Sequence, residues 1–128
     1  MNIGDEYGGG IVFSVDETGK HGLIAAKEDL SGHSSGNEEG RFTWSDAKAA
    51  CNDFVSNSYS DWFLPNKEQL NQLYLQKRVV GGFADYSTYY WSSSESSATN
   101  AWLQVFSNGY QSTSNKGYVS RVRAVRAF

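Results

Sequence analysis

The chain of 128 residues contains few of the residue types that supply covalent or metal-based stability. It has one cysteine, one proline and two histidines. A lone cysteine excludes an internal disulfide, and neither His21 nor His33 has a partner at the spacing of a metal site, so we expect both to be solvated. A chain of this length can bury a hydrophobic core without a disulfide or a metal ion. We therefore expect a single domain over residues 1–128 that packing alone holds together.

The sequence also lacks a long apolar run and a block of like charges. No apolar segment approaches the length of a membrane span. The start, MNIGDEYGGG, lacks the basic and apolar regions of a secretory signal, so we expect that the protein stays where it is made or that a leader has been removed. The net charge of −3 favours neither nucleic acid nor an anionic membrane as a partner. Arg121, Arg123 and Arg126 alternate with apolar residues, which indicates strand residues paired with nearby acids.

What the sequence does contain is aromatic residues, at 15% of the chain, and thirteen glycines. That mixture is typical of a compact domain with many short strands and turns. The first segment predicts a hairpin, with strands at 11–15 and 22–26 and a turn at 16–20. Asp16 and Glu17 at its tip are typical turn residues, although acids there could also suggest calcium. The polar stretch 27–41 is rich in Gly and Ser and predicts a surface loop.

Two helices should follow this loop. The first begins after a cap at Thr43 or Ser45, because apolar residues recur at helical spacing: Ala47, Ala50, Cys51 and Phe54. The second begins after Pro65 with Asn66 as its cap, and its apolar face consists of Leu70, Leu73 and Tyr74. From residue 89 onward the pattern is strand-like. The order of hairpin, helices and further strands predicts an α+β domain in which the N-terminal and C-terminal strands pair.

The C-terminal part holds an unusual strand at 101–106. Trp102, Gln104 and Phe106 alternate with Ala101, Leu103 and Val105, and the residues that follow are mostly Ser, Asn, Thr, Gly and Tyr. Side chains of a strand alternate between its two faces. We expect the first set to face the core and the second set to face solvent.

Few residues are arranged for catalysis. Ser92 to Ser94 offer hydroxyl groups, but no histidine lies near them in sequence, so backbone hydrogen bonding beside a buried Trp91 is the expected role. Calcium-dependent sugar sites use an acidic or amide residue followed by proline, whereas Pro65 follows Leu64. We therefore expect no metal, no cofactor and no enzymatic activity.

Several motifs, in order along nearly the whole chain, resemble one family. The segments GDEYGGGIVF, HGLIAA, WSDAKAAC, DWFLPNKEQLNQLY, YWSSSE, AWLQVF and RVRAVRAF are similar to the Lcl C-terminal domain-like family. The resemblance implies a C-type lectin-like fold, shared with formylglycine-generating-enzyme-like domains, with both termini together and an irregular binding surface in the C-terminal half. Phe63 departs from the family pattern, which usually has Arg in DWRLP, and this puts a salt bridge at that position in doubt.

The tail over 89–128 is similar to the variable regions that diversity-generating retroelements diversify in phages and gut bacteria. Their randomised codons end in a pyrimidine and cannot encode Trp, Gln, Lys, Glu or Met. Eighteen positions outside the supposed fixed anchors all hold permitted residues: Ser96, Ser97, Ala98, Thr99, Asn100, Leu103, Val105, Ser107, Asn108, Tyr110, Ser112, Thr113, Ser114, Asn115, Gly117, Tyr118, Val119 and Ser120. These positions, Ala98 apart, are the candidate ligand-binding residues. The supposed fixed residues are Trp91, Glu95, Trp102, Gln104, Phe106, Gly109, Gln111 and Lys116.

The resemblance thus implies a non-enzymatic module at a cell or virion surface that binds a protein or glycan through its C-terminal surface. One alternative is an adhesin tip or structural cap whose surface is fixed. Another is an enzyme like the formylglycine-generating enzymes, whose chemistry uses a pair of cysteines that hold copper. Cys51 is the single cysteine of this chain, and its place on an apolar helix face indicates a small core residue.

Overall fold

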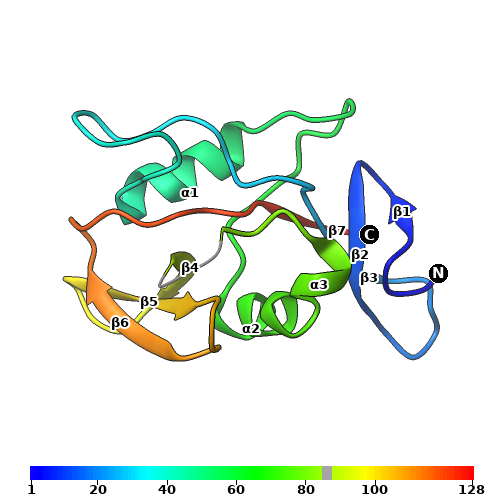
Figure 1. The fold of residues 1–128 in the computed structure, drawn as a ribbon. Coiled ribbons are helices and arrows are strands. Elements are labelled where there is room, and N and C mark those ends of the chain that lie inside the picture. The colour runs from blue at the N-terminus through cyan, green and yellow to red at the C-terminus, as the bar shows by residue number, and fades with distance from the viewer. Residues whose placement is uncertain (85–87) are drawn as a thin grey trace.

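The computed structural model describes residues 1–84 and 88–128, which form two antiparallel sheets and three helices (Figure 1). The larger sheet has the order β1-β2-β3-β7, with bounds Glu6–Tyr7, Gly10–Val15, Gly22–Ala25 and Val125–Ala127. The smaller sheet has the order β4-β5-β6, with bounds Tyr89–Glu95, Asn100–Val105 and Gln111–Asn115. The predicted α+β class is confirmed. No described helix has the length and apolar character needed to cross a bilayer.

The N-terminal hairpin forms where the sequence predicts it. β2 and β3 pair antiparallel, and the turn between them is closed by Asp16, whose carboxylate accepts hydrogen bonds from the Thr18 hydroxyl at 2.7 Å and amide at 3.0 Å. The bond from the Thr18 side chain is the main cause that lowers the pKa of Asp16. Asp16 is therefore a turn residue, as expected.

The two ends of the chain meet in the larger sheet. β7 pairs with β3, so the C-terminal strand enters the N-terminal sheet next to the third strand rather than the first. The ring of Tyr7 in β1 lies edge-on to that of Phe128, with 5.4 Å between centroids, which places the termini together (Figure 1).

Each of the two longer helices begins at a residue whose side chain caps it. α1 spans Trp44–Asp53, and the Thr43 hydroxyl accepts a hydrogen bond from the Asp46 amide. α2 spans Lys67–Leu75, and Asn66 and Gln69 form a reciprocal capping box. A short helix, α3 (Lys77–Val80), follows directly and ends at Gly81.

Two clusters of buried side chains form the core. The first lies around Trp62 and Trp91 and includes Cys51 on the inner face of α1, where burial raises the pKa of the thiol to about 12. The second lies between α2 and the sheets. Its centre is Phe106, whose ring is 4.5 Å from that of Tyr90 and 4.9 Å from that of Phe83. The helix faces predicted from the sequence are therefore the ones that pack.

The strand at 100–105, β5, corrects one expectation. Leu103 and Val105 are only 5% and 9% exposed, whereas Trp102 on the other face is partly buried. The alternation itself is right, but both faces of β5 are covered. Trp102 and Gln104 face α2, since the Lys67 ammonium lies 3.6 Å from the Trp102 ring and Gln104 donates to Asn71. Leu103 and Ala101 join Trp91 and Val122 in the first cluster.

A buried arginine joins segments that are distant in sequence. The side chain of Arg123 is fully buried, and its guanidinium donates to the Asp29 carboxylate at 2.8 and 3.1 Å and to the carbonyls of Ala26, Gly81 and Gly82 at 2.7 to 3.0 Å. Every one of these acceptors lies outside the C-terminal segment. The Phe83 ring covers the guanidinium at 3.9 Å.

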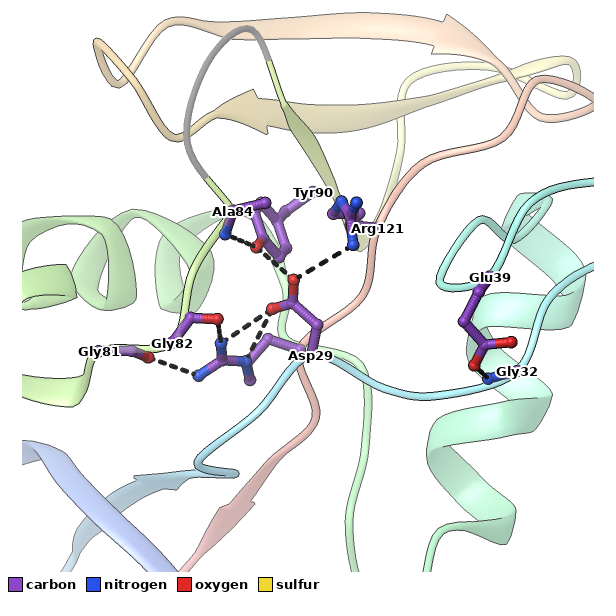
Figure 2. A network of polar contacts seen from close by, with 9 residues as sticks. Asp29, Gly32, Glu39, Gly81, Gly82, Ala84, Tyr90 and Arg121 are labelled. Carbon is purple, nitrogen blue, oxygen red and sulfur yellow. Dashed lines mark hydrogen bonds and ion pairs between the residues drawn. The ribbon is translucent and has the colours of Figure 1, made fainter.

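Asp29 extends this network to the smaller sheet (Figure 2). Its second oxygen accepts a 2.7 Å hydrogen bond from the Tyr90 hydroxyl, which in turn accepts from the Ala84 amide, and lies 3.8 Å from Arg121. Burial, and then the nearby Asp29 carboxylate, raise the pKa of Tyr90, so the phenol remains a donor. The expectation that these arginines pair with acids is confirmed, and Arg126 pairs with Asp61 at 2.7 Å.

We predict that Asp29→Ala lowers the free energy of unfolding by about 3–5 kcal/mol, because it leaves the Arg123 guanidinium buried without its counter-ion. Asp61→Ala is the matched control, since the Asp61 side chain is 60% exposed and water can replace it. This variant should lower the free energy of unfolding by about 1 kcal/mol or less. Urea unfolding followed by tryptophan fluorescence measures both. Equal losses would show that the Asp29 network stabilises the fold no more than the Asp61–Arg126 pair, whose carboxylate is exposed.

We also predict that Phe106→Ala lowers the free energy of unfolding by about 3–5 kcal/mol, since the Phe106 ring is 2% exposed and contacts three aromatic neighbours. Tyr110→Ala, four residues along the chain, should change the free energy of unfolding by no more than about 0.5 kcal/mol, because the Tyr110 ring is 65% exposed. Thermal melts of the two variants compare them directly. A melting temperature lowered as much by Tyr110→Ala as by Phe106→Ala would contradict the assignment of Phe106 to the core.

Candidate binding surface

Fifteen of the eighteen positions form three groups around the smaller sheet, and the other three, Asn100, Leu103 and Val105, lie in β5. One group is the β4–β5 turn at 96–99, the second is the β5–β6 turn at 107–110, and the third is β6 with the segment 117–120 that follows it. The first two groups lie at opposite ends of β5, because they are the turns that connect it to its neighbours. All but three of the eighteen positions are exposed or partly buried. The exceptions are Leu103, Val105 and Ser120, and Ser120 is 2% exposed because its backbone pairs with Phe42.

The third group lines a hollow of about 310 Å³ on one face of the sheet. In the strand register, Trp91 stands opposite Leu103 and Leu103 opposite Ser112, so these side chains share that face. The hollow is lined by Leu103 and by residues of β6 and the loop after it, together with one residue of β4: Ser112, Thr113, Ser114, Tyr118, Val119, Ser120 and Tyr89. Seven of the candidate positions thus meet at one place.

Tyr89 is the lining residue that the sequence analysis missed. It begins β4 directly before the buried Tyr90 and Trp91, and its ring is 43% exposed. Its only sequence signal is its place at the start of a strand. The next three residues are all buried, so this signal does not distinguish a surface residue from a buried one.

The chemistry of the hollow is neutral. Its lining consists of two exposed tyrosines, aliphatic side chains and hydroxyl groups, with no charged residue, histidine or cysteine. Tyr118 is the more exposed tyrosine, at 68%. Such a surface can cover an apolar group and hydrogen-bond its rim, but it offers no base to activate a serine.

The side chains supposed to be fixed make contacts that tie the sheet to α2 or hold its own strands together. Gln104 donates to Asn71 at 2.9 Å, and Gln111 donates to the Lys67 carbonyl at 3.2 Å, so both tie the sheet to α2. Lys116 pairs with Glu95 at 2.6 Å and donates to the Ala98 carbonyl at 3.0 Å, which holds the β4–β5 turn.

Gly109 is constrained in a different way. Its φ is +83°, a backbone conformation that favours glycine, and a Cβ added there would come within 2.5 Å of the Tyr74 ring. The β5–β6 turn therefore passes against α2 only because this residue has no side chain.

Polar side chains at the turn positions, in contrast, bond mainly within their own turns. Asn108 accepts from the Tyr110 amide at 2.9 Å, and Asn115 accepts from the Gly117 amide at 2.8 Å. In the β4–β5 turn, Ser97 accepts from the amide of Asn100 at 3.1 Å. Replacing these three residues changes the hydrogen bonds within a turn. The contacts that attach the sheet to α2 are left intact.

Outside this surface, the other candidate residues have structural roles. Ser92 donates to the Trp102 carbonyl at 2.7 Å, and Ser94 accepts from the Lys67 amide at 2.9 Å, as expected for backbone hydrogen bonding. His21 and His33 are exposed. Within residues 1–84 and 88–128, no three His, Cys, Asp or Glu side chains are grouped so that they could hold a metal ion.

Comparison with known proteins supports the family resemblance. The family model described as Lcl C-terminal domain matches residues 20–126, from the end of the first hairpin's turn to β7. The comparison with curated proteins gives no match. Because the match covers most of the chain, including all of the candidate surface, the protein belongs to the Lcl C-terminal domain family.

Proposed function

We propose that this domain, with the C-type lectin-like fold that its resemblance implies, is a non-enzymatic module that binds a macromolecular ligand on its C-terminal surface. The ligand is a protein or a glycan of another surface. The observation that carries the proposal is the meeting of seven candidate positions around one neutral hollow with two exposed tyrosines. Tyrosine supplies rigid amphipathic contact area, and small polar residues supply adaptable hydrogen bonds, as in antibody loops.

Tyr118 and Tyr110 are the proposed anchors, because interfaces draw most of their energy from a few residues and tyrosine is enriched among them. Both rings are more than half exposed. Tyr118 borders the hollow, whereas Tyr110 lies on the β5–β6 turn. A ligand that contacts both must therefore cover β6, which lies between them.

We further propose that retroelement diversification varies this surface. Diversification requires that the side chains that vary are not the side chains that maintain the fold. The division described above supports this requirement, since Gln104, Gln111 and Lys116 bond to distant segments whereas the turn residues bond locally. Leu103, Val105 and Ser120 are buried and fall outside the proposed variable set.

The alternative is a fixed-surface adhesin or structural tip. Membership of the Lcl C-terminal domain family favours it, because the family match extends over the scaffold and the surface alike. An enzyme of the formylglycine-generating type is not favoured by the residues present, since the single cysteine is buried in α1 with its thiol pKa raised to about 12.

We predict that Tyr118→Ala weakens ligand binding at least about tenfold, the effect expected for an interface anchor. The probes are an array of bacterial surface glycans and a random 12-residue peptide library displayed on phage, both applied to the wild-type domain. Leu75→Ala is the control, because Leu75 is an equally exposed apolar residue at the end of α2. Wild-type affinity in Tyr118→Ala, or equal losses in both variants, would contradict the proposed surface.

Diversification predicts a pattern among sibling genes in a mixed population. Substitutions should concentrate at the exposed and partly buried candidate positions, while Trp91, Gln104, Phe106 and Gly109 stay constant. Deep sequencing of the gene measures this, and a reverse-transcriptase gene beside a near-identical template repeat is the expected context. Substitutions spread evenly over the chain, or gathered in α1 and α2, would favour the fixed-surface alternative.

A further inference from the structure

The outer strand of the smaller sheet, β6, has an open edge. In an antiparallel pair, hydrogen-bonded and non-hydrogen-bonded positions alternate. The amide of Val105 donates to Tyr110, and the amide of Lys116 donates to Thr99, both at 2.8 Å. In the continuous register between these two bonds, Ser112 and Ser114 also direct their backbone groups toward β5. The backbone groups of Gln111, Thr113 and Asn115 therefore point away from the sheet.

The other edges in the described part of the chain are occupied or short. β4 pairs on its outer side with the C-terminal segment, through the Trp91 and Arg121 amides. β7 bonds reciprocally with Phe63. β1 has only two residues. Along β6, the Asn115 carbonyl accepts from the Tyr118 amide. The backbone groups of Gln111 and Thr113 remain directed outward, where the Thr113 carbonyl has one long contact, at 3.5 Å, with the Ser112 hydroxyl.

The sequence of β6 does not protect this edge. Proteins usually block exposed edges with charged residues, prolines, bulges or very short strands. β6 reads QSTSN, with no charge and no proline, and its five residues pair with β5 in unbroken register. This edge can therefore accept another strand.

The hollow lies beside the same edge. Ser112 and Ser114 are small and share the face of Leu103, so a longer side chain on an added strand can reach over them to Leu103 and Tyr118. The hollow is uncharged, and its floor is aliphatic. It favours an apolar side chain from the occupant.

We infer that the β6 edge binds an extended polypeptide segment of a partner protein by β-strand addition, with an apolar side chain of that segment in the hollow over Leu103. This rests on the proposed function and specifies its ligand. The alternating backbone N–H and C=O groups of Gln111 and Thr113 match a peptide backbone, which a glycan does not possess. A second copy of this chain fits less well, because its own β6 has only polar side chains and would leave the hollow unfilled.

Thr113→Pro and Thr113→Val test the inference as a matched pair. Both remove the hydroxyl, but only proline removes the outward N–H, and an edge strand tolerates proline at such a position. The probe is a set of peptides selected on the wild-type domain from a random 12-residue library displayed on phage. We expect Thr113→Pro to bind these peptides at least about tenfold more weakly than Thr113→Val does, measured by fluorescence anisotropy.

A second measurement uses the wild-type domain and does not depend on the folding of Thr113→Pro. Each selected peptide is made in two versions, N-methylated at one or the other set of alternate residues. One version should lose binding and the other should keep it, because only alternate amides of an added strand face β6. Equal binding of both versions, together with unchanged binding to a folded Thr113→Pro, would overturn the inference.

The remaining outcomes also discriminate. If Tyr118→Ala loses binding while folded Thr113→Pro keeps it, the edge inference fails and the proposed surface stands. If the library gives no peptide while a glycan array gives ligands that depend on Tyr118, strand addition is again overturned. Concentration-dependent dimerisation that Thr113→Pro abolishes, measured by analytical ultracentrifugation, would assign the edge to a second copy instead.

Discussion

The buried ion pair of Arg123 and Asp29 is the interaction on which the arrangement of the domain depends. A buried guanidinium must have most of its donors satisfied, because an unpaired charge in the interior is very costly. Arg123 finds its acceptors on the segment after β3 and on the residues after α3, and Asp29 then binds Tyr90 of β4. The ion pair of Arg123 and Asp29 thus fixes the smaller sheet relative to the larger one (Figure 2).

Fixing β4 in this way determines which edge of the smaller sheet is free. The edge of β4 that faces away from β5 is covered by the C-terminal segment that carries Arg121 and Arg123, so β6 provides the free edge of this sheet. The contacts that hold β5 and β6 are made by a few long side chains, among them Gln104 and Gln111, which reach α2. The exposed residues of the turns and of β6 are released from packing, and the domain can present them to a ligand.

The sequence predicts the local elements well because their signals are local. The caps at Thr43 and Asn66 and the turn at Asp16 all act within a few residues. Burial in β5 could not be predicted the same way. Alternation shows that Leu103 and Trp102 face opposite sides, but coverage of the Leu103 side depends on Val122, nineteen positions away. The identity of Asp29 as the acid that pairs with Arg123 likewise follows from topology, since no spacing links the two.

The polar composition of the stretch after β5 has a physical reason in an edge strand. An apolar edge with the same register would stack with other chains and aggregate. Ser, Thr, Asn and Gln keep the backbone groups of β6 available while removing the apolar area that drives indiscriminate pairing. The apolar contact is placed instead one strand inward, at Leu103, and beside the edge, at Tyr118. Under the strand addition we propose, a segment must match both the backbone edge and the hollow to bind well, and this double requirement would give a polar strand its selectivity.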